Sequence, residues 1–358
     1  MYSSRWNVTL GATICHAFFI GLVYILPSVI LSSGCYWIDM LDNQCMATYG
    51  LGTAIGLVLS GFSLAGVLFP VGLGTLLEWF GWRTTVFFSF LFFVLIIVPL
   101  AYLTLQQGTL VSSMNEDTAS SSVHHSINTN LVSATDFKSL LLSPSFWLLG
   151  FEYFSLAYSQ SFPFDYLVTY LHEDASFTYE KATIFLSIMN ACAVVSKLLG
   201  GIIGDYSSRF KTLLASSFLM LMGVLCLLQR QSTGKEEKPY WTMTNRIGQL
   251  VSFSILFGLG SGSLWNNLYA LVPFYIGTGH LGFSQNSLSA LHYLGSAIGS
   301  MMGGIVKTQT GSFTIDIVGI AAVCFLNLLV ALYLTWQQQM SLSNTIQVEY
   351  STPNDEME

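Results

Sequence analysis

The chain has 358 residues, of which 53% are apolar and 9% are charged, and its mean hydropathy is +0.60. Soluble globular proteins carry roughly 25% charged residues, so the 12 Lys and Arg and 19 Asp and Glu are too few to keep this chain dissolved. High hydrophobicity excludes intrinsic disorder, and a net charge of −7 without a basic stripe argues against nucleic-acid binding. The composition therefore predicts a multi-pass membrane protein embedded in a lipid bilayer.

A membrane-spanning helix needs about 20 predominantly apolar residues, and the sequence contains nine runs of this kind. The runs are continuously apolar rather than alternating, which favours helices over transmembrane β-strands. We therefore expect an all-α transmembrane bundle of about nine spans. The expected spans are Val8–Leu31, Gly50–Leu73, Thr85–Leu105, Phe146–Tyr170, Ala182–Gly204, Thr212–Leu228, Gly248–Ile276, Asn286–Ile305 and Phe313–Trp336.

Polar stretches divide these spans into two groups. Residues 106–138 are rich in Ser, Thr and His, a composition typical of a flexible linker. The linker separates three spans in residues 1–105 from six spans in residues 139–336. Since a six-helix bundle is a common half of a transporter, residues 139–336 are predicted to form such a half and residues 1–105 a partial N-terminal bundle. Residues 337–358 form a polar tail with an acidic end, for which we expect no regular structure.

Glycines recur at helical spacing within several spans. Gly295, Gly299 and Gly303 lie four residues apart, and a second cluster occupies residues 258–262. In lipid, small residues at one face let helix backbones approach closely. Two interpretations of this pattern stay open, namely tight static packing and helices that slide against each other during alternating access.

A short loop between two expected spans carries Gly204, Asp205 and Arg209 in the pattern G-D-x-x-x-R. The glycine allows close helix approach, and the two charged side chains can hold neighbouring helix ends together. This pattern resembles the loop motif of the major facilitator superfamily, which lies between the second and third helices of each half. The resemblance implies a major-facilitator-like bundle in which Gly204, Asp205 and Arg209 form a gating loop.

Four further stretches resemble the monocarboxylate transporter family within that superfamily. They are Phe-Gly-Trp-Arg at residues 80–83, Leu-Ser-Ile-Met-Asn-Ala at 186–191, residues 257–273 and residues 281–313. By this resemblance the nine spans correspond to helices four to twelve, so the family's first three helices and the substrate-binding Lys on its first helix have no counterpart. On the eighth helix, where family members carry an Asp and an Arg, this chain has Ala193 and Lys197.

The resemblance implies a secondary-active or facilitative transporter of small monocarboxylates, such as lactate or pyruvate, with coupling to H+. It implies a protein of the plasma membrane that is not an enzyme and that has an ancillary membrane subunit. The six Cys residues show no metal-binding spacing, and no phosphate-binding Gly-rich loop is present, so neither a cofactor nor a metal is expected. The alternative is a transport-dead truncated relative that acts by association with a full-length partner; a receptor or channel fits nine spans and the transporter-like loop less well.

Lys197 is the first candidate among the polar residues inside the spans. Ionisable groups at membrane depth are costly and are functional candidates by default. Lys197 lies mid-span without an acidic residue one turn away, so we interpret it as a binding group for an anionic carboxylate substrate. The structural alternative is an ion pair with Glu152 or Asp165. Asn190 and Asn266 are candidates for hydrogen bonds to the substrate, or equally for polar links between helices.

Three other groups are candidates for proton coupling. Asp165 follows Pro163, where a helix kink would admit water, and Glu152 lies about 20 Å away along the same helix. His292 is an isolated histidine on an apolar helix, which is more often a hydrogen-bond donor between helices than a ligand.

Two features of the sequence predict opposite orientations of the chain in the membrane. The family resemblance places the linker, the loop at residues 205–211 and the tail in the cytosol. The Lys and Arg residues of the expected loops favour the opposite orientation by about eight to three. We follow the resemblance, because several aligned stretches outweigh a statistical bias.

Overall fold

The computed structural model describes residues 51–92, 94–95, 99, 141–173, 177–228, 239–276 and 281–351. The first expected span and the linker at residues 106–138 lie outside this part of the chain. The residues described are almost entirely helical and contain no β-strand. The prediction of an all-α bundle is confirmed.

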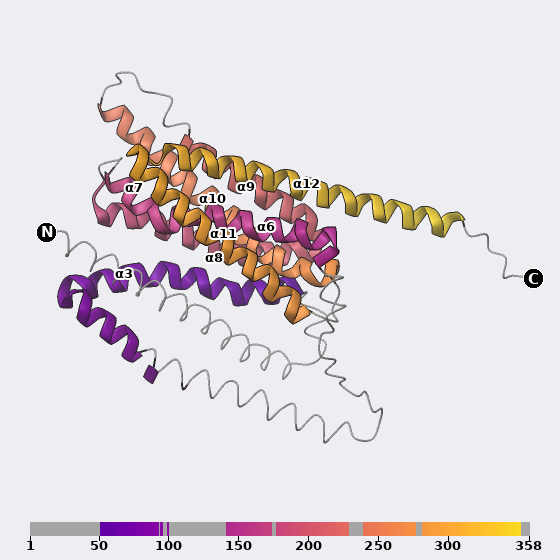
Figure 1. Ribbon diagram of the computed structural model, residues 1–358, viewed down its shortest axis with the longest axis horizontal. Helices are drawn as coiled ribbons and strands as arrows, with labels where there is room; N and C mark the ends of the chain where they lie inside the picture. Colours follow the sequence, from indigo (N-terminus) through magenta and orange to yellow (C-terminus); the bar gives the residue numbers. More distant parts are fainter. Residues whose placement is uncertain are drawn as a thin grey trace, which may run out of the picture.

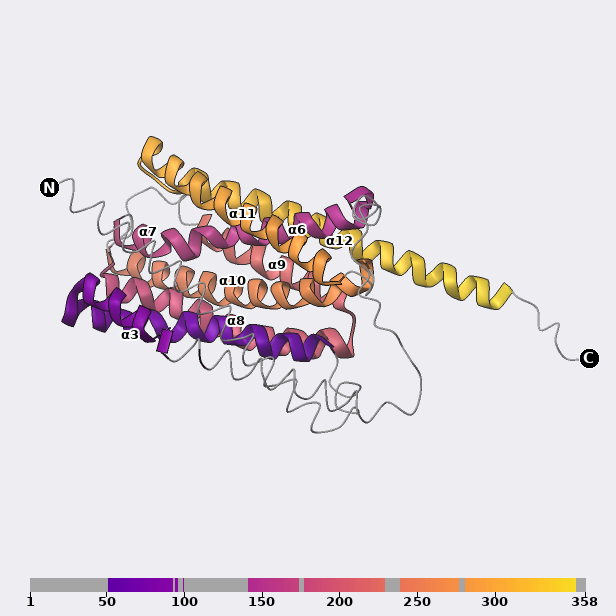
Figure 2. The same ribbon diagram turned by 60° about the horizontal axis from the view of Figure 1, so that its bottom comes forward.

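The helices run side by side along one direction (Figure 1), and a view turned by 60° shows the same arrangement with α10 in the middle (Figure 2). The elements are α3 (Leu51–Phe92), α6 (Pro144–Ser161), the π-helix η2 (Phe162–Tyr166), α7 (Leu167–Glu173), α8 (Tyr179–Tyr206), α9 (Arg209–Leu228), α10 (Pro239–Ile276), α11 (Leu281–Thr310) and α12 (Thr314–Ser351). In the described part of the chain, four helical segments are long and apolar enough to cross a bilayer: Lys181–Tyr206, Arg209–Leu228, Arg246–Ile276 and Thr314–Met340.

Helix α3 consists of two arms that meet at Gly81. Gly81 has φ 72° and ψ 166°, a backbone conformation outside the helical region that costs glycine little because it has no Cβ atom. The chain therefore reverses direction here, and the indigo ribbon of α3 turns back on itself in Figure 1. This turn coincides with the Phe-Gly-Trp-Arg stretch that separates the second and third expected spans.

A π-helical turn interrupts the expected span over residues 146–170. Pro163 lies in this turn; it lacks a backbone N–H, and its ring clashes with the preceding helical turn. A wider turn relieves the clash, and the Leu167 N–H bonds the carbonyl oxygen of Phe162, five residues earlier. The expected kink is therefore a π-turn that carries Asp165, and π-turns of this kind are frequent at functional sites.

Two helices extend beyond their expected ends. Helix α10 begins at Pro239, where proline is favoured because the first helical N–H has no partner. Helix α12 continues past Trp336 to Ser351 and projects beyond the other helices (Figure 1, yellow). The expectation of no regular structure from residue 337 is therefore wrong up to residue 351. The apolar run ends at Trp336, but Gln and Met are good helix formers and let the helix continue.

The glycines within the spans mark places where helix backbones come into close contact. A Cβ atom at Gly258 would collide with the carbonyl oxygen of Met189 on α8, and one at Gly260 would lie 2.5 Å from the amide nitrogen of Met220 on α9. On α11, a Cβ atom at Gly295 would collide with the carbonyl oxygen of Phe154 on α6. Of the two interpretations left open by the sequence, these contacts support tight packing; sliding during transport stays a prediction.

We predict that Gly258→Ala lowers the thermal stability of the protein in detergent. The added methyl group forces α8 and α10 apart, and overpacking of this kind costs about 1–3 kcal/mol. The matched control is Gly248→Ala on the same helix, since a Cβ atom at Gly248 meets nothing within 4 Å. The control should melt at or slightly above the parent temperature; equal melting temperatures for the two variants would contradict the close contact.

Candidate functional site

Lys197 lies on α8 with only 4% of its surface exposed. Its Nζ atom donates to the carbonyl oxygen of Leu59 at 3.0 Å and to the Ser63 hydroxyl at 2.8 Å. Both acceptors belong to α3. The lysine therefore links α3, which precedes residues 106–138, to the helices that follow them.

Helix α10 joins the same junction through Asn266. Its Nδ2 atom donates to the carbonyl oxygen of Lys197 at 3.1 Å, and its buried Oδ1 atom has no hydrogen-bond partner among the residues described. Glycines bring the backbones together here: a Cβ atom at Gly56 would collide with the Lys197 carbonyl, and one at Gly201 would collide with the Gly52 carbonyl. The structure thus brings Lys197 and Asn266 together where α3, α8 and α10 meet.

Asn190 lies two turns before Lys197 on α8 and is 2% exposed. Its Nδ2 atom donates to the carbonyl oxygen of Leu186 at 3.0 Å, within its own helix. The described contact is therefore local, and it does not join α8 to a neighbouring helix.

The loop motif of Gly204, Asp205 and Arg209 holds the beginning of α3. The carboxylate of Asp205 accepts the backbone N–H groups of Gly52 at 3.0 Å and Thr53 at 2.8 Å, and also the Thr53 hydroxyl at 2.7 Å. Arg209 donates to the same carboxylate at 2.5 Å. Because the first N–H groups of a helix have no partner within it, Asp205 both satisfies them and places negative charge at the positive end of the helix dipole.

Gly204 and Arg209 bring the loop motif against α10. A Cβ atom at Gly204 would lie 2.8 Å from Oδ1 of Asn267, so the glycine keeps the end of α8 close to α10. The guanidinium carbon of Arg209 lies 5.3 Å from the ring centre of Phe274, also on α10. The loop motif therefore joins α3, α8 and α10 at one end of the bundle.

Glu152 is completely buried on α6. Its Oε2 atom accepts a 2.5 Å hydrogen bond from Nδ2 of Asn327 on α12, and the same nitrogen donates to the Ser155 hydroxyl at 2.7 Å. In the described part of the chain, neither Oε1 of Glu152 nor Oδ1 of Asn327 has a hydrogen-bond partner. The carboxyl group therefore faces an amide between two helices.

The other two proton-coupling candidates, Asp165 and His292, each contact a neighbouring helix. Asp165, on the π-turn, accepts a short hydrogen bond from the hydroxyl of Ser300 on α11. His292, on α11, places Nδ1 3.2 Å from the carbonyl oxygen of Tyr153 and its ring 4.3 Å from that of Trp265. The histidine is thus engaged between helices, as the sequence suggested for an isolated histidine.

The structure divides the expected site residues into separate groups. Lys197 and Asn266 lie at the junction of α3, α8 and α10, with the loop motif at the end of the same helices. Glu152 lies between α6 and α12, His292 lies between α6 and α11, and Asp165 lies between η2 and α11. The two carboxylates that the sequence offered as ion-pair partners of Lys197 contact Asn327 and Ser300 instead.

Sequence reasoning missed the partners of these residues. Ser63, Thr53 and Ser300 are ordinary small polar residues within apolar runs, and nothing in their local pattern singles them out. Asn327 carried a signal, since it is the one amide in the apolar run from residue 317 to 336. A polar side chain at that depth requires a partner on another helix.

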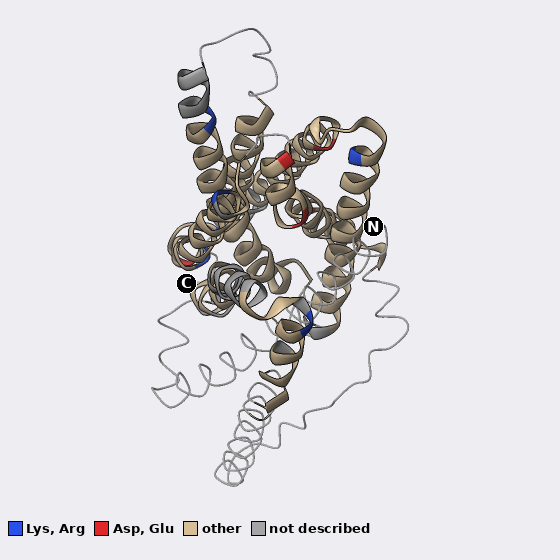
Figure 3. Ribbon diagram, turned by 90° about the vertical axis from the view of Figure 1, so that its left-hand side faces the viewer, with Lys and Arg blue, Asp and Glu red and all other residues tan. Residues whose placement is uncertain are grey.

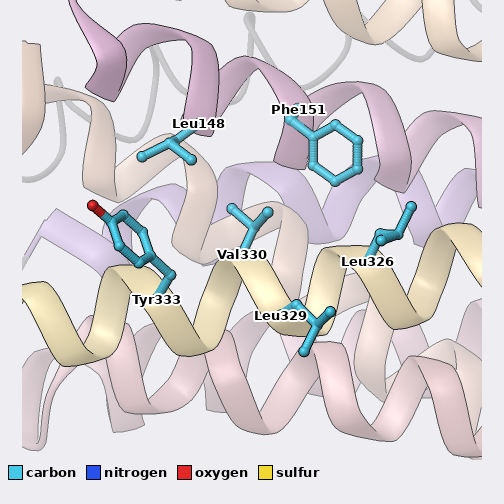
Figure 4. A pocket seen from close by; sticks show the side chains of 6 residues that line it. All are labelled: Leu148, Phe151, Leu326, Leu329, Val330 and Tyr333. Atoms are coloured by element: carbon cyan, nitrogen blue, oxygen red, sulfur yellow. The ribbon is translucent and has the colours of Figure 1, made fainter.

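One hollow on the outer surface of the bundle lies between α6 and α12. It encloses about 320 Å³ and is lined by Leu148, Phe151, Leu326, Leu329, Val330 and Tyr333 (Figure 4). The Tyr333 hydroxyl is the one polar side-chain group among these six residues. The hollow is therefore suited to apolar chains of the bilayer rather than to an anion.

Charged groups are sparse along the bundle (Figure 3). Long apolar helices, joined by short loops and by buried polar contacts, define the class of polytopic α-helical membrane proteins. Residues 46–244 match the family model of the Major Facilitator Superfamily. This match covers more than half of the chain, and the chain belongs to that superfamily.

Three curated relatives illustrate the relationship. One is the Fujikurins efflux protein of Gibberella fujikuroi, to which the chain is 24% identical over 234 residues, covering 63% of this chain and 43% of the relative. The chain is 25% identical over 263 residues to the MFS-type transporter opdF of Penicillium oxalicum, covering 72% of this chain and 54% of the relative. It is 24% identical over 216 residues to the Agnestins efflux protein AgnL12 of Paecilomyces divaricatus, covering 59% of this chain and 41% of the relative. The chain therefore spans about half the length of the curated relatives it matches.

Solved structures show the same fold at low identity. The fucose:proton symporter FucP of E. coli superimposes with a TM-score of 0.56 at 13% identity, over 88% of this chain and 83% of that one. A bacterial homologue of the iron transporter ferroportin, in an outward-facing state, gives a TM-score of 0.57 at 16% identity, over 80% and 65% of the two chains. These likenesses show the fold alone.

We predict that Asp205→Ala destabilises the protein in detergent, because loss of a helix-capping side chain costs about 0.5–2 kcal/mol. The exchange Asp205→Arg with Arg209→Asp keeps an opposite-charge pair at the same spacing but leaves arginine opposite the N–H groups of Gly52 and Thr53. We expect thermal melting to show that the exchange does not restore stability. Full restoration would mean that the ion pair, rather than the cap, is what matters.

Proposed function

We propose that this chain is a secondary transporter of small organic anions of the monocarboxylate class, such as lactate or pyruvate. Membership of the Major Facilitator Superfamily supports transport, as does the likeness to relatives that are named transporters and efflux proteins. The resemblance of four stretches to the monocarboxylate transporters supports the substrate class. We place the transporter in the plasma membrane, with an ancillary membrane subunit as its partner, on the same resemblance.

The position of Lys197 is the observation that carries this proposal. Its Nζ atom reaches from α8 to α3, and so joins the six-helix half to the part of the chain before residue 106. Transporters of this kind bind substrate between their two halves, near the middle of the bilayer. A lysine buried at that boundary supplies positive charge to replace the hydration that a carboxylate loses on entry.

Asn266 is proposed to assist Lys197 in holding the substrate. Its amide oxygen is buried and has no hydrogen-bond partner among the residues described, so it is available to accept a hydroxyl group such as that of a 2-hydroxy acid. The role of Asn190 is weaker, because its amide nitrogen is engaged with the backbone of its own helix.

We propose that Asp205, with Gly204 and Arg209, gates the pathway by holding the first turn of α3. Four contacts of the Asp205 carboxylate, three to residues of α3 and one to Arg209, must break if α3 is to separate from the end of α8. Such a cluster favours one arrangement of the two halves and yields when substrate binding favours the other.

Export of an organic compound is a second candidate function. Two relatives are named for the efflux of agnestins and of fujikurins, which favours outward movement of the substrate. The two candidate functions differ in the direction of transport and in the size of the substrate. The direction can be tested with vesicles that carry the substrate on either side of the membrane.

We expect Lys197→Gln to reduce uptake of radiolabelled lactate or pyruvate into proteoliposomes holding this chain alone. Loss of a charge-assisted hydrogen bond costs about 1.5–3 kcal/mol, equivalent to a ~10- to 100-fold weaker interaction. Lys197→Arg keeps the charge and should retain part of the uptake. The assay is run at two pH values, since H+ coupling makes uptake faster when the outer side is more acidic.

The matched control is Lys181→Gln, which removes an exposed lysine from the same helix and should leave uptake unchanged. Equal uptake by Lys197→Gln and the parent chain would contradict the role of Lys197. Uptake at neither pH, together with release of preloaded compound, would favour export. Neither uptake nor release would favour a transport-dead chain that acts through a full-length partner.

A further inference from the structure

The contact between Glu152 and Asn327 has fewer hydrogen-bond donors than buried acceptors. An amide nitrogen carries two hydrogens, and Nδ2 of Asn327 donates one to Glu152 and the other to Ser155. The hydroxyl hydrogen of Ser155 is itself directed to the backbone carbonyl of Glu152 at 3.1 Å. Two buried acceptors, Oε1 of Glu152 and Oδ1 of Asn327, therefore have no donor among the residues described.

An ionised carboxylate in this position would be costly. It can only accept hydrogen bonds, so it would leave Oε1 and Oδ1 bare in an apolar interior. A buried charge requires both an opposite charge and hydrogen bonds to be tolerated, and no ion pair of Glu152 occurs within the described part of the chain. One added proton removes the charge and supplies the missing donor.

We propose that Glu152 is a proton-binding site and that Asn327 is its positioning residue. The added proton bonds to the carboxyl group, and the resulting O–H is donated to Oδ1 of Asn327. The amide N–H continues to be donated to the other carboxyl oxygen, so two hydrogen bonds join acid and amide across α6 and α12. Deprotonation breaks one of these bonds and leaves a charge between the two helices.

Among the residues described, the titratable groups nearest this pair are phenols, a thiol and an imidazole. Tyr153 on α6 contacts Tyr269 on α10, with ring centres 5.8 Å apart, and Cys324 on α12 contacts the Ser159 hydroxyl of α6. Phenol and thiol groups are neutral at neutral pH. His292 on α11 is directed to the backbone carbonyl of Tyr153.

The remaining carboxyl groups on the packed elements lie far along their helices. Asp165 on η2 is about 20 Å from Glu152 along the helix axis, and Asp316 on α12 is about 16 Å from Asn327, at 1.5 Å per residue. Glu152 is therefore distant from these acids. Its protonated form is favoured by the hydrogen bond to Asn327 and by the apolar surroundings, which disfavour the charge.

The inference rests on the contacts of Glu152 and stands whether or not the chain transports a substrate. A role for Glu152 in coupling rests on the proposed transport function, because only a transporter couples proton release to the movement of a substrate. The two proposals can fail separately. Uptake measurements test transport, whereas infrared spectroscopy tests only whether Glu152 is protonated.

The experiment is infrared spectroscopy of the full chain in lipid nanodiscs during a pH titration. A carboxylic acid and a carboxylate absorb at different frequencies, so a protonated Glu152 gives a carbonyl band at neutral pH that shifts in D2O. We expect Glu152→Gln to lose this band. Asn327→Leu removes the hydrogen bonds to the acid and should move the band to higher frequency, because the site becomes more apolar and the neutral acid is retained without its partner.

Glu173→Gln is the matched control, because Glu173 is exposed and paired with Lys307 at 3.2 Å. It should leave the neutral-pH band unchanged. If Glu152→Gln does not fold, glutamate labelled with 13C in the parent chain shows whether a glutamic acid band exists at neutral pH.

Two results would overturn the inference. The first is a spectrum at neutral pH in which Glu152→Gln removes carboxylate bands alone, since Glu152 would then be ionised. The second is a Glu152 signal that responds to added Na+ at constant pH, since the site would then bind a metal cation instead of a proton.

Discussion

The need to satisfy polar groups inside an apolar bundle governs this structure. Lys197, Asp205 and Glu152 are each too costly to bury alone, and each is held by a residue of another helix: Ser63, Thr53 and Asn327, respectively. In lipid the hydrophobic effect does not drive helices together, so close backbone packing and these polar contacts determine which helices are neighbours.

Asp205 and Lys197 contact helix α3 at two different positions. Asp205 holds the beginning of α3 through the backbone N–H groups of Gly52 and Thr53 and through the Thr53 hydroxyl. Lys197 holds the middle of α3 through the Leu59 carbonyl and the Ser63 hydroxyl. Helix α3 is thus attached to α8 at two levels, and glycines at 52, 56 and 201 let the backbones approach closely enough for both attachments.

The pair formed by Glu152 and Asn327 joins two other helices, α6 and α12. Helix α10 packs against both α6 and α8, and Tyr153, next to Glu152, contacts Trp265, next to Asn266. The proposed proton site and the proposed substrate site are therefore connected through α10.

Much of the architecture followed from the sequence alone. Continuous apolar runs predicted helices, because every backbone polar group in a bilayer must be satisfied within its own segment. Pro163 correctly indicated an interruption of the regular helix, since a proline lacks the backbone N–H that a regular helical turn needs. The end of α12 was misplaced, because the sequence reports where apolar residues stop and not where hydrogen bonding along a helix stops.

The sequence determined which residues would carry charge inside the apolar spans, namely Lys197, Glu152 and Asp165, because charge at membrane depth is rare enough to be conspicuous. The fold buries Lys197 and Glu152 but leaves Asp165 exposed. Only the tertiary structure decided what each of them faces. The sequence offered Glu152 or Asp165 to Lys197, whereas the fold placed Asn327 and Ser300 against those carboxylates. The physical reason is that side-chain partners are set by which helix faces meet, and no periodicity along one helix records the identity of its neighbour.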